Sequence, residues 1–118
     1  MLKPLVFETL LALAAGEQHG WALVRDLETR TGQRILPGNF YRTLRALVAE
    51  GLVEEVEVDD LPRARARALP ETGLNADRRR YLRLTADGRA AAKAEARRLD
   101  DLVAESRSRH LLSARRRS

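Results

Sequence analysis

The sequence predicts a mainly α-helical fold with one small antiparallel β-hairpin. Four segments of the 118-residue chain place apolar side chains at helical spacing, and the last of them is the longest. Two short segments instead alternate apolar and charged residues, as the strands of a half-buried sheet do. A chain of this length has only a modest core, so we expect one domain per chain and a second subunit that adds buried surface.

The first helix is expected over residues 3–15, with Pro4 in its first turn and Gly16 just after its end. Its apolar residues cover most of the circumference: Leu5, Val6, Phe7, Leu10, Leu11, Leu13 and Ala14. A helix that is apolar nearly all round is buried on two sides. One side would face the core of its own chain and the other a second subunit. The alternative is that the whole helix surface belongs to the intrachain core.

Two further helices are expected over residues 19–31 and 37–50, joined by a short link. The first stops at Gly32 and has an inner face made of Leu23, Val24 and Leu27. The second starts at Pro37, whose fixed φ and missing N–H suit the first helical position, and closes at Gly51. Its apolar side consists of Phe40, Leu44, Leu47 and Val48. Two helices joined in this way form a helix-turn-helix.

The opposite side of the 37–50 helix carries small and basic residues. Gly38, Ala46 and Ala49 let another molecule approach the backbone closely. Residues near the start of such a helix reach base edges, and Asn and Arg side chains suit bases and phosphates. We therefore expect DNA contacts from Asn39, Tyr41, Arg42, Thr43 and Arg45. The alternative is an ordinary solvated helix face, with Tyr41 half in the core.

Residues 52–58 and 80–84 are expected to pair as antiparallel strands. The loop between them, residues 59–79, is far longer than a usual hairpin turn, and loops of that length are usually functional or disordered. We expect its middle to contact phosphates or a narrow minor groove through Arg63, Arg65 and Arg67, with Arg78 and Arg79 also at the DNA. In the alternatives, acids on the adjoining strand pair with Arg78, Arg79 and Arg80, or the loop touches nothing.

A long helix is expected from the N-cap Thr85, with Asp87 in its first turn, to about residue 107. One side carries residues suited to close contact with another helix: Ala90, Ala91, Ala94, Leu99, Leu102 and Val103. We expect a DNA-binding domain over residues 1–84, a dimerisation helix over residues 85–109 and a disordered basic tail over residues 110–118.

Charge is distributed unevenly along the chain. Residues 1–60 hold six Lys or Arg and ten Asp or Glu, a net charge of −4, whereas residues 61–118 hold sixteen and seven, a net charge of +9. This asymmetry favours an anionic partner, nucleic acid first and a membrane surface second. The chain has no cysteine and no apolar stretch of membrane-spanning length. We expect a cytoplasmic, nucleoid-associated protein without a membrane partner.

Enzyme chemistry and metal binding have little support in the sequence. The two histidines are His19 and His110, and there is neither a Gly-rich phosphate loop nor a G-x-S-x-G motif. His19 is expected to start a helix rather than to bind a ligand. Trp21 is a candidate for stacking on an effector, against the alternative that it packs. We expect no catalytic residue, metal or cofactor.

Four local motifs occur in a characteristic order. They are H-G-W at residues 19–21, L-P-G-N-F-Y-R-T-L at residues 36–44, E-G-L-V at residues 50–53 and R-Y-L-R-L-T-A-D-G at residues 80–88. Together they resemble the PadR family of bacterial transcriptional regulators, and the resemblance extends over residues 3–105. The sequence departs from the family pattern at Asn39, Phe40 and Trp21, where Thr, Leu and Tyr are commoner, and in its long 59–79 loop.

The resemblance implies a winged helix-turn-helix with a long C-terminal dimerisation helix. It also implies a homodimeric repressor of a palindromic operator, with the third helix in the major groove and the wing at the flanking backbone or minor groove. The first and last helices would join the subunits through Leu5, Val6, Leu10, Leu13, Ala91, Ala94, Leu99, Leu102 and Val103. The alternatives are a non-specific nucleic-acid binder and a winged-helix module that binds an acidic protein. The sequence does not identify a small-molecule effector.

Overall fold

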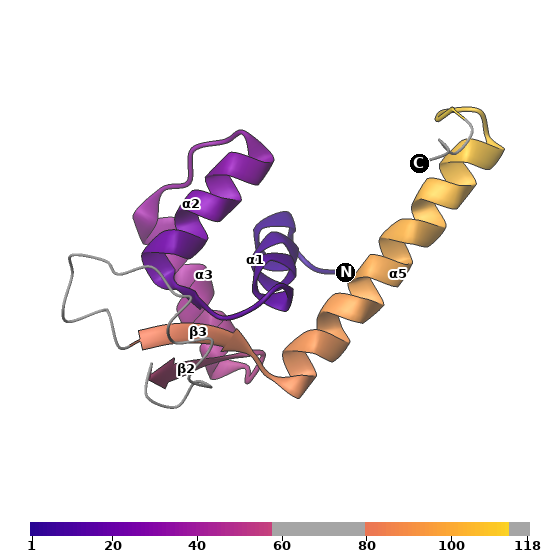
Figure 1. Ribbon diagram of the computed structural model, residues 1–118. Coiled ribbons are helices and arrows are strands. Elements are labelled where there is room, and N and C mark those ends of the chain that lie inside the picture. The colour runs from indigo at the N-terminus through magenta and orange to yellow at the C-terminus, as the bar shows by residue number, and fades with distance from the viewer. Residues whose placement is uncertain (58–79, 114–118) are drawn as a thin grey trace.

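The computed structural model describes residues 1–57 and 80–113, which form four helices and a three-stranded sheet (Figure 1). In chain order the elements are α1 (Pro4–Ala14), β1 (Gln18–His19), α2 (Gly20–Thr31), α3 (Pro37–Ala49), β2 (Val53–Glu57), β3 (Arg80–Leu84) and α5 (Ala86–Ser108). The predicted class, mainly helical with a small antiparallel sheet, is confirmed. The helix bounds differ from the predicted ones by one residue at most.

The sheet has one more strand than the sequence predicts. β3 lies in the middle, and both neighbours are antiparallel to it, with Gln18 of β1 opposite Leu82 and Val53 of β2 opposite Leu84. The predicted antiparallel pairing of the two strands, β2 and β3, is confirmed, and β1 adds a third strand that the sequence did not predict. A strand of two residues is too short to show the alternation by which strands are recognised in a sequence.

One hydrophobic core lies between α1, α2, α3 and the sheet. Its completely or almost completely buried members are Leu10, Leu13, Leu23, Leu27, Phe40, Leu44, Leu47, Val53, Leu82 and Leu84. The prediction placed Val48 on the buried side of α3, but its side chain is 36% exposed. A helix that packs against one surface buries only a stripe, and Val48 lies at its border. Full burial of one large apolar side chain contributes about 1.5–3 kcal/mol to the free energy of folding. The buried side chains Phe40, Leu44 and Leu47 therefore anchor α3 without Val48.

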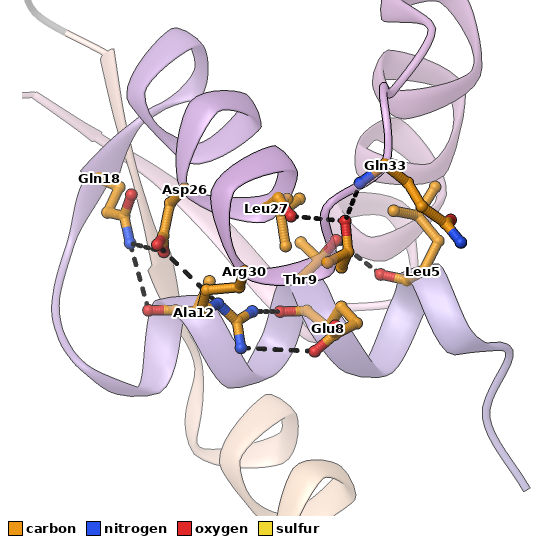
Figure 2. Close-up of polar contacts among 10 residues, drawn as sticks. Leu5, Glu8, Thr9, Ala12, Gln18, Asp26, Leu27, Arg30 and Gln33 are labelled. Carbon is orange, nitrogen blue, oxygen red and sulfur yellow. Dashed lines mark hydrogen bonds and ion pairs between the residues drawn. The ribbon is translucent and has the colours of Figure 1, made fainter.

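Polar contacts at the surface fasten α1 to α2 (Figure 2). The Arg30 guanidinium of α2 donates to the Glu8 carbonyl oxygen (3.1 Å) and forms ion pairs with the carboxylates of Glu8 (3.4 Å) and Asp26 (3.8 Å). Gln18 donates from Nε2 to the Ala12 carbonyl oxygen and to the Asp26 carboxylate, both at 3.3 Å. Partly exposed ion pairs contribute at most about 1 kcal/mol each. These contacts therefore mainly orient α2 relative to α1.

The α3 helix ends sharply at Gly51. This residue has a φ of 77°, the left-handed region that favours glycine. Its N–H donates to the Val48 carbonyl oxygen, and the Leu52 N–H donates to the Leu47 carbonyl oxygen, both at 3.0 Å. These two bonds define a Schellman motif, so the prediction that Gly51 closes the helix is confirmed.

Backbone contacts join the end of α3 to the start of α5. The Thr85 hydroxyl accepts a hydrogen bond from the Gly88 N–H (2.9 Å), which confirms the predicted N-cap, and donates to the Gly51 carbonyl oxygen (2.6 Å). The Thr85 N–H donates to the Leu52 carbonyl oxygen (3.2 Å). A Cβ on Gly88 would lie 1.9 Å from that same oxygen. Only glycine fits at this junction.

The α5 helix begins against the body of the molecule and then extends away from it (Figure 1). Its first half contacts α1 and contains the buried residues Gly88 and Glu95. In its second half the Leu102 side chain is 51% exposed. α5 therefore presents apolar surface that the described part of its own chain leaves uncovered.

Glu95 is a buried carboxylate on the side of α5 that faces the N-terminal segment. Its side chain is 5% exposed and accepts hydrogen bonds from Arg98 Nε (2.9 Å) and Nη2 (2.6 Å). These bonds lower the pKa of Glu95 to about 2, because they outweigh burial, which raises it, and the Leu2 backbone N–H lowers it further. The same hydrogen bonds raise the pKa of Arg98.

We expect the free energy of unfolding to vary with pH in the acid range because of Glu95. Because its pKa is about 2 in the folded state against an ordinary 4.5, its contribution is complete above about pH 4.5 and is lost as the pH falls toward 2. Glu95→Gln should therefore lower the Tm at pH 7, and its difference from the wild type should shrink between pH 4.5 and 2. Circular dichroism melts across this range measure both effects.

The matched control for this experiment is Glu105→Gln on the same helix. It removes an exposed ion pair with Arg109 (2.7 Å), and exposed pairs contribute little. Its Tm should stay close to that of the wild type at every pH. Equal Tm values for Glu95→Gln and the wild type at pH 7 would contradict the assigned role of Glu95.

Candidate nucleic-acid interface

The outer face of α3 combines exposed polar side chains with small residues. Asn39, Arg42 and Arg45 are exposed, whereas the opposite face of the helix is enclosed in the core. Between and beside these polar residues lie three exposed small ones, Gly38, Ala46 and Ala49. Another molecule can therefore approach the helix backbone closely and meet three hydrogen-bonding side chains.

The other two predicted contact residues lie at the borders of this face. Tyr41 is 42% exposed, and its ring stands edge-on to that of Phe40 with centroids 5.3 Å apart. Thr43 is half-buried. The structure thus brings Asn39, Arg42 and Arg45 together on one face and sets Tyr41 and Thr43 beside it.

The arginines of this face have no partner within the chain as far as residues 1–57 and 80–113 show. Neither Arg42 nor Arg45 forms an ion pair or side-chain hydrogen bond there, in contrast to Arg30, Arg83 and Arg98, which are paired with acids. Arg34, in the link before α3, is likewise exposed and unpaired within these ranges. Sequence reasoning missed Arg34, although its place in the turn of the helix-turn-helix was a usable signal.

The N-terminal end of α3 is open to an anion. Pro37 occupies the first turn, and no side chain caps the helix at Leu36. A Cβ on Gly38 would meet nothing within 4 Å, so packing does not obstruct this end. Uncapped N–H groups and the positive end of the helix dipole suit a phosphate.

The turn between α2 and α3 is fixed by three local features. Gly32 ends α2 with a φ of 68°, as predicted. The Ile35 N–H donates to the Glu28 carboxylate (2.8 Å), and the Gln33 N–H donates to the Thr31 hydroxyl (3.2 Å). These bonds leave little freedom in the angle between the two helices and so set the orientation of α3.

The start of α2 carries the only tryptophan of the chain. His19 caps the helix, because its Nδ1 accepts a hydrogen bond from the Trp21 N–H (3.1 Å), which confirms its predicted role as a helix-start residue. The Trp21 side chain is 48% exposed, and the Arg25 guanidinium lies 4.8 Å from its ring centre. Trp21 therefore lies on the surface, outside the core.

The residues expected at a subunit interface fall into two groups. Leu10 and Leu13 are 0% and 2% exposed, so their own chain leaves them no surface for a second one. The others are half-buried or exposed: Leu5, Val6, Ala91, Ala94, Leu99, Leu102 and Val103. On α1, Leu11 adds an apolar side chain that is 42% exposed.

Some predicted features lie outside the described residues. These include the loop arginines Arg63, Arg65, Arg67, Arg78 and Arg79, and residues 114–118 of the expected tail. Their DNA contacts and the domain boundaries stay predictions.

In the part of the chain that the structure describes, no helix has the length and apolarity needed to cross a membrane, and no group of three acidic or histidine side chains could hold a metal ion.

A helix-turn-helix followed by antiparallel strands, with an exposed basic face on its second helix, defines the winged-helix class of DNA-binding proteins. Residues 9–75 match the model of the transcriptional regulator PadR-like family. The chain belongs to this family and is a DNA-binding transcriptional regulator. The resemblance that the four sequence motifs carry is thereby confirmed.

Solved structures include several with the same fold. RosR of H. salinarum is 26% identical, with 96% of this chain and 81% of that chain covered and a TM-score of 0.57. A PadR family transcription regulator from Clostridium difficile is 13% identical, and the match covers 90% of this chain and 97% of that chain with a TM-score of 0.63. A transcriptional regulator from Thermoplasma acidophilum is 18% identical, and the match covers 94% of this chain and 93% of that chain with a TM-score of 0.62.

A search of curated proteins finds no match. Because the RosR relatives are archaeal, the expected bacterial origin stays a prediction.

Proposed function

We propose that this chain is a repressor that binds a palindromic operator in double-stranded DNA sequence-specifically, as a homodimer. The outer face of α3 carries the proposal. Two guanidinium groups that have no partner among residues 1–57 and 80–113, those of Arg42 and Arg45, project together with the Asn39 carboxamide from a helix whose other face is anchored in the core. Arg pairs well with guanine and Asn with adenine in the major groove. The protein acts at the nucleoid by binding alone, without a catalytic step.

The small residues of α3 support reading of base edges over a purely electrostatic attachment. Gly38, Ala46 and Ala49 have little or no side chain, so the helix backbone can come close to the DNA. The neighbouring polar side chains can then reach the base edges in a groove. The uncapped N-terminus of α3 and Arg34 supply groups for the phosphates on either side. Base contacts and phosphate contacts thus have separate donors on this surface.

The apolar surface on α1 and α5 supports the homodimer. Leu102 and Leu11 are 51% and 42% exposed, and they lie on the two helices that pack against each other. Joining two chains through this surface would remove it from water and pair two α3 helices. Dimers of this class read half-sites about one helical turn of DNA, roughly 34 Å, apart.

A footprint on the DNA immediately upstream of the gene tests the proposed function. We expect protection of a sequence with two-fold symmetry, and much weaker binding to a scrambled duplex of the same composition at equal salt concentration. Equal affinity for both duplexes would indicate a non-specific nucleic-acid binder. Binding to neither would favour a winged-helix module for an acidic protein partner.

The dimer is tested by Leu102→Glu. A charge at this position opposes burial against a second chain, so we expect the variant to be monomeric at concentrations at which the wild type is dimeric. Sedimentation velocity measures the change. Leu111→Glu is the matched control, because Leu111 lies beyond the end of α5 and is 76% exposed. Equal sedimentation of both variants and the wild type would place the interface elsewhere.

A further inference from the structure

A cavity of about 540 Å³ lies between the outer part of α3 and the sheet. Sites for small molecules commonly have volumes of about 300–1,000 Å³. Leu44 and Val48 of α3 and Leu82 of β3 form its apolar lining, and the Tyr41 ring lies beside Gly20 at the start of α2. The cavity thus offers a flat or branched apolar group a surface that is contiguous with the proposed DNA-binding face.

A buried hydrogen-bond donor borders the cavity. The His19 side chain is 4% exposed, and its Nδ1 accepts the Trp21 N–H. Because Nδ1 accepts this bond, the ring N–H lies at Nε2. This N–H forms no hydrogen bond to residues 1–57 or 80–113, although buried donors are normally satisfied. A ligand with an acceptor oxygen would satisfy it.

Two charges of opposite sign also border the cavity. Arg45 enters from α3 and Glu55 from β2, and neither forms an ion pair with the other or with any further residue in the described ranges. The cavity therefore combines an apolar wall, an N–H donor, a cation and an anion. An aromatic compound that carries both a carboxylate and an ammonium group complements all four.

We infer that this cavity binds a small aromatic zwitterion of the amino-acid type. The ligand carboxylate meets Arg45 and the His19 Nε2–H, its ammonium meets Glu55, and its ring packs on Leu44, Val48 and Leu82. Because Arg45 also belongs to the face of α3 assigned to DNA, the ligand and DNA compete for it. This competition rests on the proposed function, whereas the ligand site does not.

Binding of L-phenylalanine to the full chain without DNA tests the site. The controls are 3-phenylpropionate, which lacks the ammonium group, and 2-phenylethylamine, which lacks the carboxylate. We expect saturable binding of L-phenylalanine by calorimetry, at least about tenfold tighter than that of either control. Fluorescence of Trp21, which follows Gly20 in the chain, should change in parallel. No saturable binding, or equal binding of all three compounds, would overturn the inference.

Two variants separate this cavity from other apolar surfaces. Ala49→Leu fills cavity space from α3, whereas Ala46→Leu makes the same change at an exposed position of the same helix outside the cavity lining. L-phenylalanine binding should weaken more than tenfold in the first and stay unchanged in the second. His19→Asn keeps an N-cap acceptor but removes the ring donor, so it should preserve helix content and weaken binding similarly. Wild-type affinity in Ala49→Leu would overturn the site.

Competition is measured separately, by adding L-phenylalanine to the complex of the protein with its operator. We expect the apparent affinity for DNA to fall in the wild type and to stay constant in His19→Asn, measured relative to the affinity of each protein without ligand. Direct binding without this fall would retain the site and overturn its link to DNA. Failure of the chain to bind any operator would contradict the proposed function alone.

Discussion

Replacing Gly88 with alanine is expected to lower the free energy of unfolding by about 3 kcal/mol, the upper range for overpacking in a well-packed site. The added Cβ would lie 1.9 Å from the Leu52 carbonyl oxygen and 2.9 Å from its carbon. Both atoms belong to the backbone, so no side-chain rotation relieves the overlap. The Thr85 contacts with Leu52 and Gly51 would have to shift together. Urea unfolding followed by circular dichroism measures the loss.

Gly38→Ala is the matched control for this prediction. It makes the same chemical change in a helix, but at a position where a Cβ would meet nothing within 4 Å. Alanine favours a helix over glycine by up to about 1 kcal/mol, so the control should match or exceed the stability of the wild type. If Gly88→Ala were as stable as Gly38→Ala, the close packing of α5 on Leu52 would be wrong.

Replacing Arg42 with alanine is expected to weaken operator binding by about 1–3 kcal/mol, a five- to 150-fold loss, and to relax base preference at one position of each half-site. The guanidinium is exposed, unpaired within the described ranges, and mounted on the anchored helix α3. Its removal deletes a donor from the proposed interface without touching the core. Titration against a set of singly substituted operators measures both effects.

Arg97→Ala provides the control for charge. Arg97 is an exposed residue of α5, and the variant lowers the net charge by the same amount at a distance from α3. We expect wild-type base preference and only a small change in affinity. A similar loss for Arg42→Ala and Arg97→Ala, with unchanged base preference in both, would mean that Arg42 acts only through its charge.

The sequence predicts the helices of this fold well because their signals are local. Gly32 and Gly51 adopt left-handed backbone conformations and Thr85 accepts the hydrogen bond of an N-cap, as their residue types indicate. β1 escaped prediction because its pairing with β3 depends on residues more than sixty positions away. The tight fit of Gly88 against Leu52 is also a tertiary contact, which periodicity does not reveal.

The candidate interface was predictable in part, because helical spacing is a local signal in the sequence. Helical spacing identifies the side of α3 that carries Asn39 and Arg42, but it does not show which arginines have partners elsewhere in the fold. Arg30 and Arg83 form ion pairs with acids from other elements, whereas Arg34 has no such partner in the part of the chain that the structure describes. The cavity arises where α3, β2 and the start of α2 meet. Its lining comes from residues distant in sequence and therefore has no local motif.

Hydrogen bonds from Thr85 to Gly51 and Leu52 hold the start of α5 against the end of α3, so the angle at this joint determines where the rest of α5 lies. With 23 residues α5 is about 34 Å long, so a tilt of about 10° at the joint displaces its far end by about 6 Å. In a dimer held through α5 the same geometry acts in reverse, and a small rotation at the seam changes the separation of the two α3 helices. The contact point of this joint is the Leu52 carbonyl oxygen, which accepts a hydrogen bond from the Thr85 N–H and packs against Gly88. Half-site spacing would therefore be tuned by substitutions at this joint, far from any base.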